Sequence, residues 1–198
     1  MTKVSRAEEW KELCRSKRYR QVVEEFNQLT NKNGLNLQEL LPLSYAMIET
    51  RQFDSAEAIL KALFEKSPQT IEISINYSFL LMRKESWKDA STFLQNVTSK
   101  YFTNSPKLFW NLGLSLAHTN KTPEAMQALE KSLKFKPKWI EPQIDLALLK
   151  LEQKDFKGAE LAIQEALQWV PTSSRAKAVS REIKKSLTPD NIYRQDSE

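Results

Sequence analysis

The sequence predicts an all-α fold, a right-handed solenoid of about five helix pairs followed by a capping helix. Three observations support this prediction: a regular internal repeat, a scarcity of glycine, and a composition that favours helices. The chain has 198 residues, of which 3 are Gly and 8 are Pro. Sandwiches, barrels and phosphate-binding loops normally need more glycine in their turns. A chain of this length can hold one continuous repeat array with a sizeable core.

Side-chain size recurs along the chain at a near-constant interval. Small residues stand at Ala56, Ala90, Ala125 and Ala159, with spacings of 34, 35 and 34. A second row of small residues keeps the same register at Ser44, Ser78, Gly113 and Ala147. The position three residues before each alanine is held by Phe53, Trp87, Thr122 and Phe156. Self-similarity at such a period is typical of repeat architectures.

The two rows of small residues have a physical cause. Small side chains let two helices pack at an interaxial distance of about 8–10 Å, and the large residues beside them fill the remaining space. Proline cannot continue a helix interior, so Pro68, Pro137 and Pro171 predict the step to the next pair. The segment Thr122-Pro123-Glu124 predicts a helix start with Thr122 as the N-cap.

These features resemble the tetratricopeptide repeat, whose pattern W-x2-L-G-x2-Y…A-x3-F…P recurs at the same period. The best copy runs from Phe109 through Leu112-Gly113 and Leu116 to Ala125, Leu129 and Pro137. The resemblance covers residues 37–171. A weaker copy begins near Lys3 and keeps Tyr19 at the second-helix position, but it departs from the pattern at the small-residue and proline sites.

The resemblance divides the chain into segments. We expect four repeats at 37–70, 71–105, 106–139 and 140–171, preceded by a degenerate first repeat or cap at 1–36. A capping helix at 172–187 covers the last pair, because a terminal repeat would otherwise expose apolar surface, and 188–198 is expected to be a flexible tail. The second helix of the first pair is predicted over 19–31. The connection Phe102–Ser105 carries the one extra residue between repeats.

The charge pattern is mildly basic, with 30 Lys and Arg against 25 Asp and Glu, a net charge of +5. The excess gathers in two clusters, at Arg15, Lys17, Arg18 and Arg20, and at Arg175, Lys177, Arg181, Lys184 and Lys185. Solvated helix faces explain such clusters; an acidic partner, an anionic membrane or RNA is the alternative.

No run of apolar residues approaches the roughly 20 needed to span a bilayer. With a single cysteine, Cys14, and no apolar leader at the start, we expect a cytoplasmic protein.

Catalytic chemistry is not expected. The chain has one histidine, His118, and one cysteine, so the usual zinc ligand sets cannot be assembled. No glycine-rich phosphate loop is present, and the carboxylates are scattered among Lys and Arg at helix-surface spacing. We therefore expect no enzyme, no cofactor, no metal and no small-molecule substrate.

The resemblance implies that the first helix of each pair lines a concave groove for a partner peptide or helix. On the family's groove positions, the candidate binding residues of this chain are Tyr45, Ile48, Ile75, Asn76, Phe79, Lys107, Trp110, Asn111, Leu114, Asp145 and Leu148. Tyr45, Phe79, Trp110, Ile144 and Leu148 could form an apolar stripe, or several of them could point into the core. Asn76, Asn111 and Asp145 share the sixth repeat position, where in some family members an Asn hydrogen-bonds the main chain of a bound peptide.

Some family members grip the C-terminal carboxylate of chaperones with a Lys/Asn/Asn/Lys/Arg clamp. Those positions here hold Leu41, Tyr45, Asn76, Lys107 and Asn111, or one repeat later Ile75, Phe79, Asn111, Glu141 and Asp145. Neither set supplies the cations, so a chaperone-tail adaptor is not favoured.

Three functional hypotheses follow. The leading one is a protein-protein interaction module, an adaptor or scaffold that binds a partner peptide or helix to assemble a complex. The second is a dedicated assembly or export chaperone that holds an apolar client segment. The third is a basic nucleic-acid or membrane-surface binder that uses the two terminal clusters; insertion into the membrane is not favoured, and the oligomeric state is left open.

Overall fold

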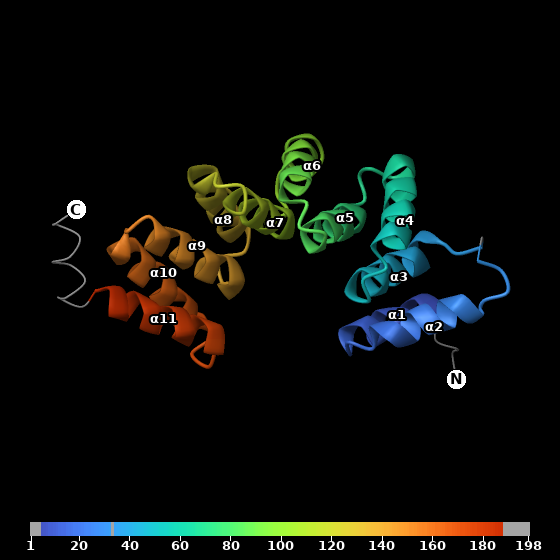
Figure 1. Cartoon of the computed structure of the whole chain (residues 1–198), viewed down its shortest axis with the longest axis horizontal. Coiled ribbons are helices and arrows are strands. Elements are labelled where there is room, and N and C mark those ends of the chain that lie inside the picture. The colour runs from blue at the N-terminus through green and yellow to red at the C-terminus, as the bar shows by residue number, and fades with distance from the viewer. Residues whose placement is uncertain (1–4, 33, 188–198) are drawn as a thin grey trace. The chain divides into compact units, whose positions relative to one another are not determined.

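The structure is a computed structural model that describes residues 5–32 and 34–187 (Figure 1). The described residues form eleven α-helices and no β-strand, which confirms the predicted all-helical class. The predicted tail at 188–198 lies outside the described residues. None of the described helices is long and apolar enough to cross a membrane.

The helices fall into two compact units. Unit 1 ends at Phe102 and contains α1 (Arg6–Arg15), α2 (Tyr19–Gln28), α3 (Leu37–Glu49), α4 (Phe53–Lys66), α5 (Ile71–Arg83) and α6 (Trp87–Lys100). Unit 2 begins at Thr103 and contains α7 (Pro106–Ala117), α8 (Thr122–Phe135), α9 (Ile140–Glu152), α10 (Phe156–Trp169) and α11 (Ser174–Ser186). The boundary falls in the connection that carries the extra residue.

Within each unit, a helix packs against its pair partner and against helices of the neighbouring pair. In unit 1, α3 contacts α4 within its pair and α1, α2 and α5 outside it. In unit 2, α9 contacts α10 within its pair and α7, α8 and α11 outside it. The first helices of consecutive pairs therefore lie side by side within a unit, as the repeat predicted. Fully buried residues such as Leu43 and Leu60 in unit 1, and Ala147 and Ala159 in unit 2, occupy the two cores.

Two helices of one pair approach closely at Gly113 on α7. A Cβ atom at this position would lie 2.7 Å from Leu129 Cδ2 and 3.1 Å from the carbonyl oxygen of Ala125. Leu129 is fully buried. The absence of a side chain at Gly113 is therefore what lets α8 lie against α7 at this distance.

The turn between the two helices of every pair has the same backbone geometry. One residue in each turn has a positive φ, at Lys17, Arg51, Glu85, Asn120 and Lys154, with φ between 58° and 63°. The next residue donates its N–H to the carbonyl five positions earlier, as Arg18 does to Leu13 at 2.8 Å, which is the Schellman motif. Lys17 stands one full repeat before Arg51. The turn between α1 and α2 therefore occupies the same repeat position as the turns of the other pairs, and it has the same geometry.

The first pair nevertheless differs from the others. Trp10 stands one full repeat before the small residue Ser44; it is fully buried, and its indole N–H donates to Glu25 Oε2 at 2.7 Å. Helix α2 ends at Gln28, earlier than the predicted end at 31. Leu29 leaves the helix in an extended conformation with ψ of 130° and packs against the unit 1 core. Because Leu29 packs there, α2 ends before the polar residues that follow Leu29 in the sequence.

Helix starts agree with simple capping chemistry in several places but not at α8. Asn36 and Glu39 form a capping box at α3, and Asp155 Oδ1 accepts the Gly158 N–H at 2.9 Å in α10. At α8 the expected N-cap is wrong: Thr122 is already helical, and Lys121 holds the cap position without a side-chain bond. The turn geometry at Asn120 sets this start, because it brings Thr122 into the first helical turn.

We predict that Gly113→Ala lowers the free energy of unfolding by up to about 2 kcal/mol. The added methyl overlaps a buried leucine and a backbone carbonyl, and overpacking of this kind costs about 1–3 kcal/mol, partly offset by the better helix propensity of Ala, about 1 kcal/mol. Urea denaturation followed by circular dichroism measures the change.

Gly34→Ala is the matched control, because the nearest atom to its added Cβ would be 3.7 Å away. It should leave stability unchanged or slightly increased. Equal effects of the two substitutions would contradict the close approach of α7 and α8.

Candidate functional site

The predicted groove residues lie on the first helices of the pairs, α3 and α5 in unit 1 and α7 and α9 in unit 2. In unit 1 the structure brings Tyr45 and Phe79 together as stacked rings with centroids 5.4 Å apart. Tyr19, at the start of α2, meets Tyr45 edge-on at 5.8 Å. All three rings are half-buried, and we call them the aromatic ladder.

Charged groups flank the ladder. The Arg83 guanidinium lies 6.0 Å from the centroid of the Phe79 ring, and its Nη2 is 3.8 Å from Glu49 Oε2. Burial, and next the negative charge of Glu49, raise the pKa of Tyr45 well above that of a free phenol. The Tyr45 hydroxyl therefore stays protonated at physiological pH and can donate a hydrogen bond.

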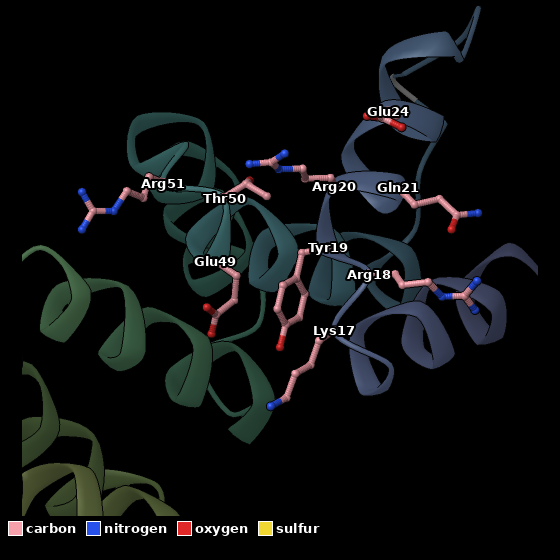
Figure 2. A pocket seen from close by; sticks show the side chains of 9 residues that line it. All are labelled: Lys17, Arg18, Tyr19, Arg20, Gln21, Glu24, Glu49, Thr50 and Arg51. Atoms are coloured by element: carbon pink, nitrogen blue, oxygen red, sulfur yellow. The ribbon is translucent and has the colours of Figure 1, made fainter.

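A hollow of about 660 Å³ lies beside Tyr19, between the turn of the first pair and the turn of the second. Its lining residues are Lys17, Arg18, Tyr19, Arg20, Gln21, Glu24, Glu49, Thr50 and Arg51, and we call it the basic hollow. In Figure 2 the polar ends of Lys17, Tyr19 and Glu49 point to the same side of the hollow, whereas Arg18 and Arg51 point outward on opposite sides. The lining of the hollow therefore carries four cations and two carboxylates.

The positive charge of the basic hollow is not neutralised by neighbouring side chains. Within residues 5–32 and 34–187, Lys17, Arg18, Arg20 and Arg51 form no ion pair, and all four are exposed. Helix α2 begins at Tyr19 and has no acidic residue in its first turn. The partial positive charge of the helix start adds to that of the side chains, so the hollow attracts anionic groups.

The other unit 1 candidates lie deeper. Ile75 is half-buried, whereas Ile48 is completely buried and contributes to the core. The Asn76 amide donates to the Leu41 carbonyl at 3.0 Å and to Ser44 Oγ at 3.1 Å. Asn76 therefore links α5 to α3 within the stack.

In unit 2 the sixth-position residue Asp145 has a similar internal role. Its Oδ2 accepts the Trp110 indole N–H at 2.6 Å, and its Oδ1 accepts a hydrogen bond from Arg175. Asp145 is only 6% exposed. One carboxylate thus connects three consecutive first helices, α7, α9 and α11.

The remaining unit 2 candidates differ in accessibility. Asn111 is buried, Leu114 and Leu148 are half-buried, and Lys107 is exposed. Partial desolvation, and next the charge of Lys136, lower the pKa of Lys107. Trp110 is half-buried and packs edge-on against Trp139 with centroids 4.9 Å apart. Among the unit 2 candidates, Lys107, Trp110, Leu114 and Leu148 are therefore the accessible ones.

Sequence reasoning did not select Tyr19 as a site residue, although it occupies the repeat position of Phe53, Trp87 and Phe156. The basic hollow was indicated only in part. Lys17, Arg18 and Arg20 belong to the N-terminal basic cluster, whereas Arg51 joins the hollow from the turn of the next repeat and was not grouped with them.

Reactive groups do not gather in the described part of the chain. No three His, Cys, Asp or Glu side chains among the described residues are placed to hold a metal ion. The Cys14 thiol lies 3.4 Å from the Pro42 carbonyl oxygen. Burial, and next the charge of Glu49, raise its pKa to about 11, so the thiolate is scarce at neutral pH.

Comparison with solved structures identifies the fold as that of tetratricopeptide-repeat proteins. A thermophilic tetratricopeptide-repeat protein of Thermus thermophilus matches 91% of this chain and 97% of its own, with a TM-score of 0.76 and 16% identity. MamA from Desulfovibrio magneticus RS-1 matches 86% and 98%, with a TM-score of 0.67 and 13% identity. A tetratricopeptide repeat protein from Parabacteroides merdae matches 75% and 60%, with a TM-score of 0.62 and 21% identity.

Similarity at the level of sequence is more limited. No protein-family profile matches the chain. A peroxisomal targeting signal receptor of Kluyveromyces lactis is 37% identical over 62 residues, which are 31% of this chain. The matched segment spans only 11% of that receptor.

We predict that Asp145 and Trp110 are energetically coupled in the stability of unit 2. Asp145→Ala should lower the free energy of unfolding by about 1–3 kcal/mol, because it leaves the half-buried Trp110 indole N–H without its acceptor and removes the hydrogen bond from Arg175. Trp110→Phe removes only the N–H and should cost about 1 kcal/mol. Chemical denaturation of both single variants and the double variant gives the coupling energy, expected to be at least about 0.5 kcal/mol.

Additive effects of the two substitutions would contradict the internal role of Asp145. The position would then be available to a partner's N–H group, as the sequence first suggested.

Proposed function

We propose that this protein is a protein-protein interaction module in which the aromatic ladder and the basic hollow of unit 1 bind a peptide or helix of a partner. The observation that carries the proposal is the continuous contact from Tyr19 through Tyr45 to Phe79. Half-buried aromatic rings fixed by packing are typical anchors of protein interfaces. Rings held rigidly in place lose little entropy when a partner binds.

The set of residues proposed to contact a partner keeps only some of the groove residues that the sequence predicted. In unit 1 it comprises Tyr45, Ile75 and Phe79, to which Tyr19 and the cations of the basic hollow are added. In unit 2 it comprises Lys107, Trp110, Leu114 and Leu148. Ile48, Asn111 and Asp145 support these residues from inside the stack.

Within this function, we favour an adaptor or scaffold that holds its partner in an assembled complex. A chaperone that holds an apolar client segment needs a broad apolar surface. In unit 1 the ladder is instead bordered by Glu49, Arg83 and the cations of the basic hollow, a combination that favours a defined segment with both apolar and charged residues.

We predict that Phe79→Ala weakens peptide binding at least about tenfold, a loss of about 1.4 kcal/mol or more. Random peptides displayed on phage are selected on the full-length chain, and the affinity of the strongest ligand is then measured by fluorescence anisotropy. Circular dichroism verifies that helicity is retained, and Phe79→Leu, which keeps most of the packing, should give an intermediate affinity.

Leu161→Ala is the matched control, because Leu161 is an apolar residue, 57% exposed, on α10. It should leave the affinity unchanged. Unaltered binding by a folded Phe79→Ala variant would sink the groove proposal.

We also predict that the selected peptides are enriched in Asp and Glu. The double variant Arg20→Gln and Arg51→Gln should weaken their binding and reduce its dependence on salt, because two cations of the hollow are lost. Affinities measured at low and moderate ionic strength test this. Lys88→Gln with Lys100→Gln on α6 removes equal charge away from the hollow and should have little effect; equal losses would refute a role for the hollow.

A further inference from the structure

The connection between α8 and α9 has an unusual composition (Figure 1). Residues 131–139 contain four lysines and no acidic residue, and Phe135 and Trp139 alternate with the cations in Lys134-Phe135-Lys136-Pro137-Lys138-Trp139. Residues 134–138 are all exposed. The proposed peptide-binding surface uses none of the residues in this segment.

Exposed apolar side chains gather at the same place. Four large apolar residues are exposed in the described part of the chain, and three of them are Phe135 at 40%, Trp169 at 44% and Val170 at 36%. Phe135 ends α8, and Trp169 ends α10. The Lys138 ammonium lies 4.5 Å from the centroid of the Trp169 ring, so the two segments form one patch.

Lysines and aromatic rings are interleaved within this patch. Lys136 lies 4.8 Å from the centroid of Trp139, and Lys131 lies 4.2 Å from that of Phe109. Phe109 in turn stacks on Phe135 at 6.2 Å. We call Lys131, Lys134, Phe135, Lys136, Lys138, Trp169 and Val170 together the lysine–aromatic edge.

The positive charge of this edge is not compensated internally. In the part of the chain that the structure describes, none of its four lysines forms an ion pair. Exposed apolar rings and uncompensated cations thus occupy one surface.

We propose that the lysine–aromatic edge adsorbs to an anionic phospholipid surface. Trp and Phe side chains place their apolar parts at the headgroup boundary, and lysines beside them bind lipid phosphates and stay hydrated on their long stems. This chemistry requires no membrane-spanning helix, and it is independent of the peptide-binding proposal.

The same observations favour lipid over single-stranded RNA. Bases that bind single-strand proteins stack on aromatic ring faces, but an ammonium already lies against Phe109, Trp139 and Trp169. The cations of the edge are all lysines, point charges without the planar fork with which arginine pairs base edges. An aromatic ring that inserts among lipid headgroups does not need an uncovered ring face, so these contacts do not prevent it.

The expected strength follows from the charges. A lysine near an anionic leaflet contributes about 1 kcal/mol, or about a fivefold factor in binding. Loss of three lysines should therefore weaken adsorption by about a hundredfold.

The test is flotation of the full-length chain with vesicles of phosphatidylcholine alone or of phosphatidylcholine with phosphatidylserine. We expect binding only to the vesicles that contain phosphatidylserine. Lys134→Gln, Lys136→Gln and Lys138→Gln combined should reduce that binding about a hundredfold. Trp169→Ala should reduce it further without changing net charge, because the ring contributes apolar contact.

The matched control is Lys121→Gln, Lys154→Gln and Lys157→Gln combined. These lysines are exposed at the opposite ends of α8 and α10, so the loss of net charge is equal. Binding by this variant should fall only slightly. Equal losses in the two triple variants, or no binding to phosphatidylserine vesicles, would overturn the proposal.

A final arm uses fluorescein-labelled poly(U). Tight binding of poly(U) that is lost with the Lys134, Lys136 and Lys138 substitutions, while vesicle binding is absent, would assign the edge to nucleic acid instead and overturn the lipid proposal. Weak poly(U) binding that is equal in both triple variants supports it.

Discussion

The close packing of two helices at small residues is the constraint on which the rest of the structure depends. Gly113 has no room for a methyl group beside Leu129 and the Ala125 carbonyl. Ser44, Ser78 and Ala147 hold the same repeat position in three other pairs and are fully buried. Small residues at this position allow the two helices of a pair to pack closely, and within each unit the first helices of consecutive pairs lie side by side.

This constraint explains why so much of the fold could be predicted from the sequence. A buried contact between two helix backbones restricts side-chain volume at a fixed position in each repeat. Small residues therefore recur along the sequence at the length of the repeat. The predicted end of α2 at residue 31 was wrong, because Leu29 leaves the helix and packs against the unit 1 core, and no local propensity records that.

The candidate site was predictable only in part, because hydrogen-bond partners come from distant segments. Position in the repeat placed Asn76 and Asp145 on first helices, but the Leu41 carbonyl and the Arg175 guanidinium that satisfy them were not evident from the period. Grouping charges along the sequence was also incomplete. Arg15 forms an ion pair with Glu12 at 3.2 Å, whereas Arg51, far away in sequence, lines the hollow with Lys17.

The left-handed residue in each hairpin turn has a consequence for engineering this chain. Glycine adopts this conformation without steric cost, yet all five positions hold larger residues, each at an expense of about 1 kcal/mol. Lys17 and Arg51 supply two of the four cations of the hollow, so glycine at either position would remove a charge from it. Glu85 does not line the hollow, so a stabilising substitution at Glu85 leaves those charges unaltered.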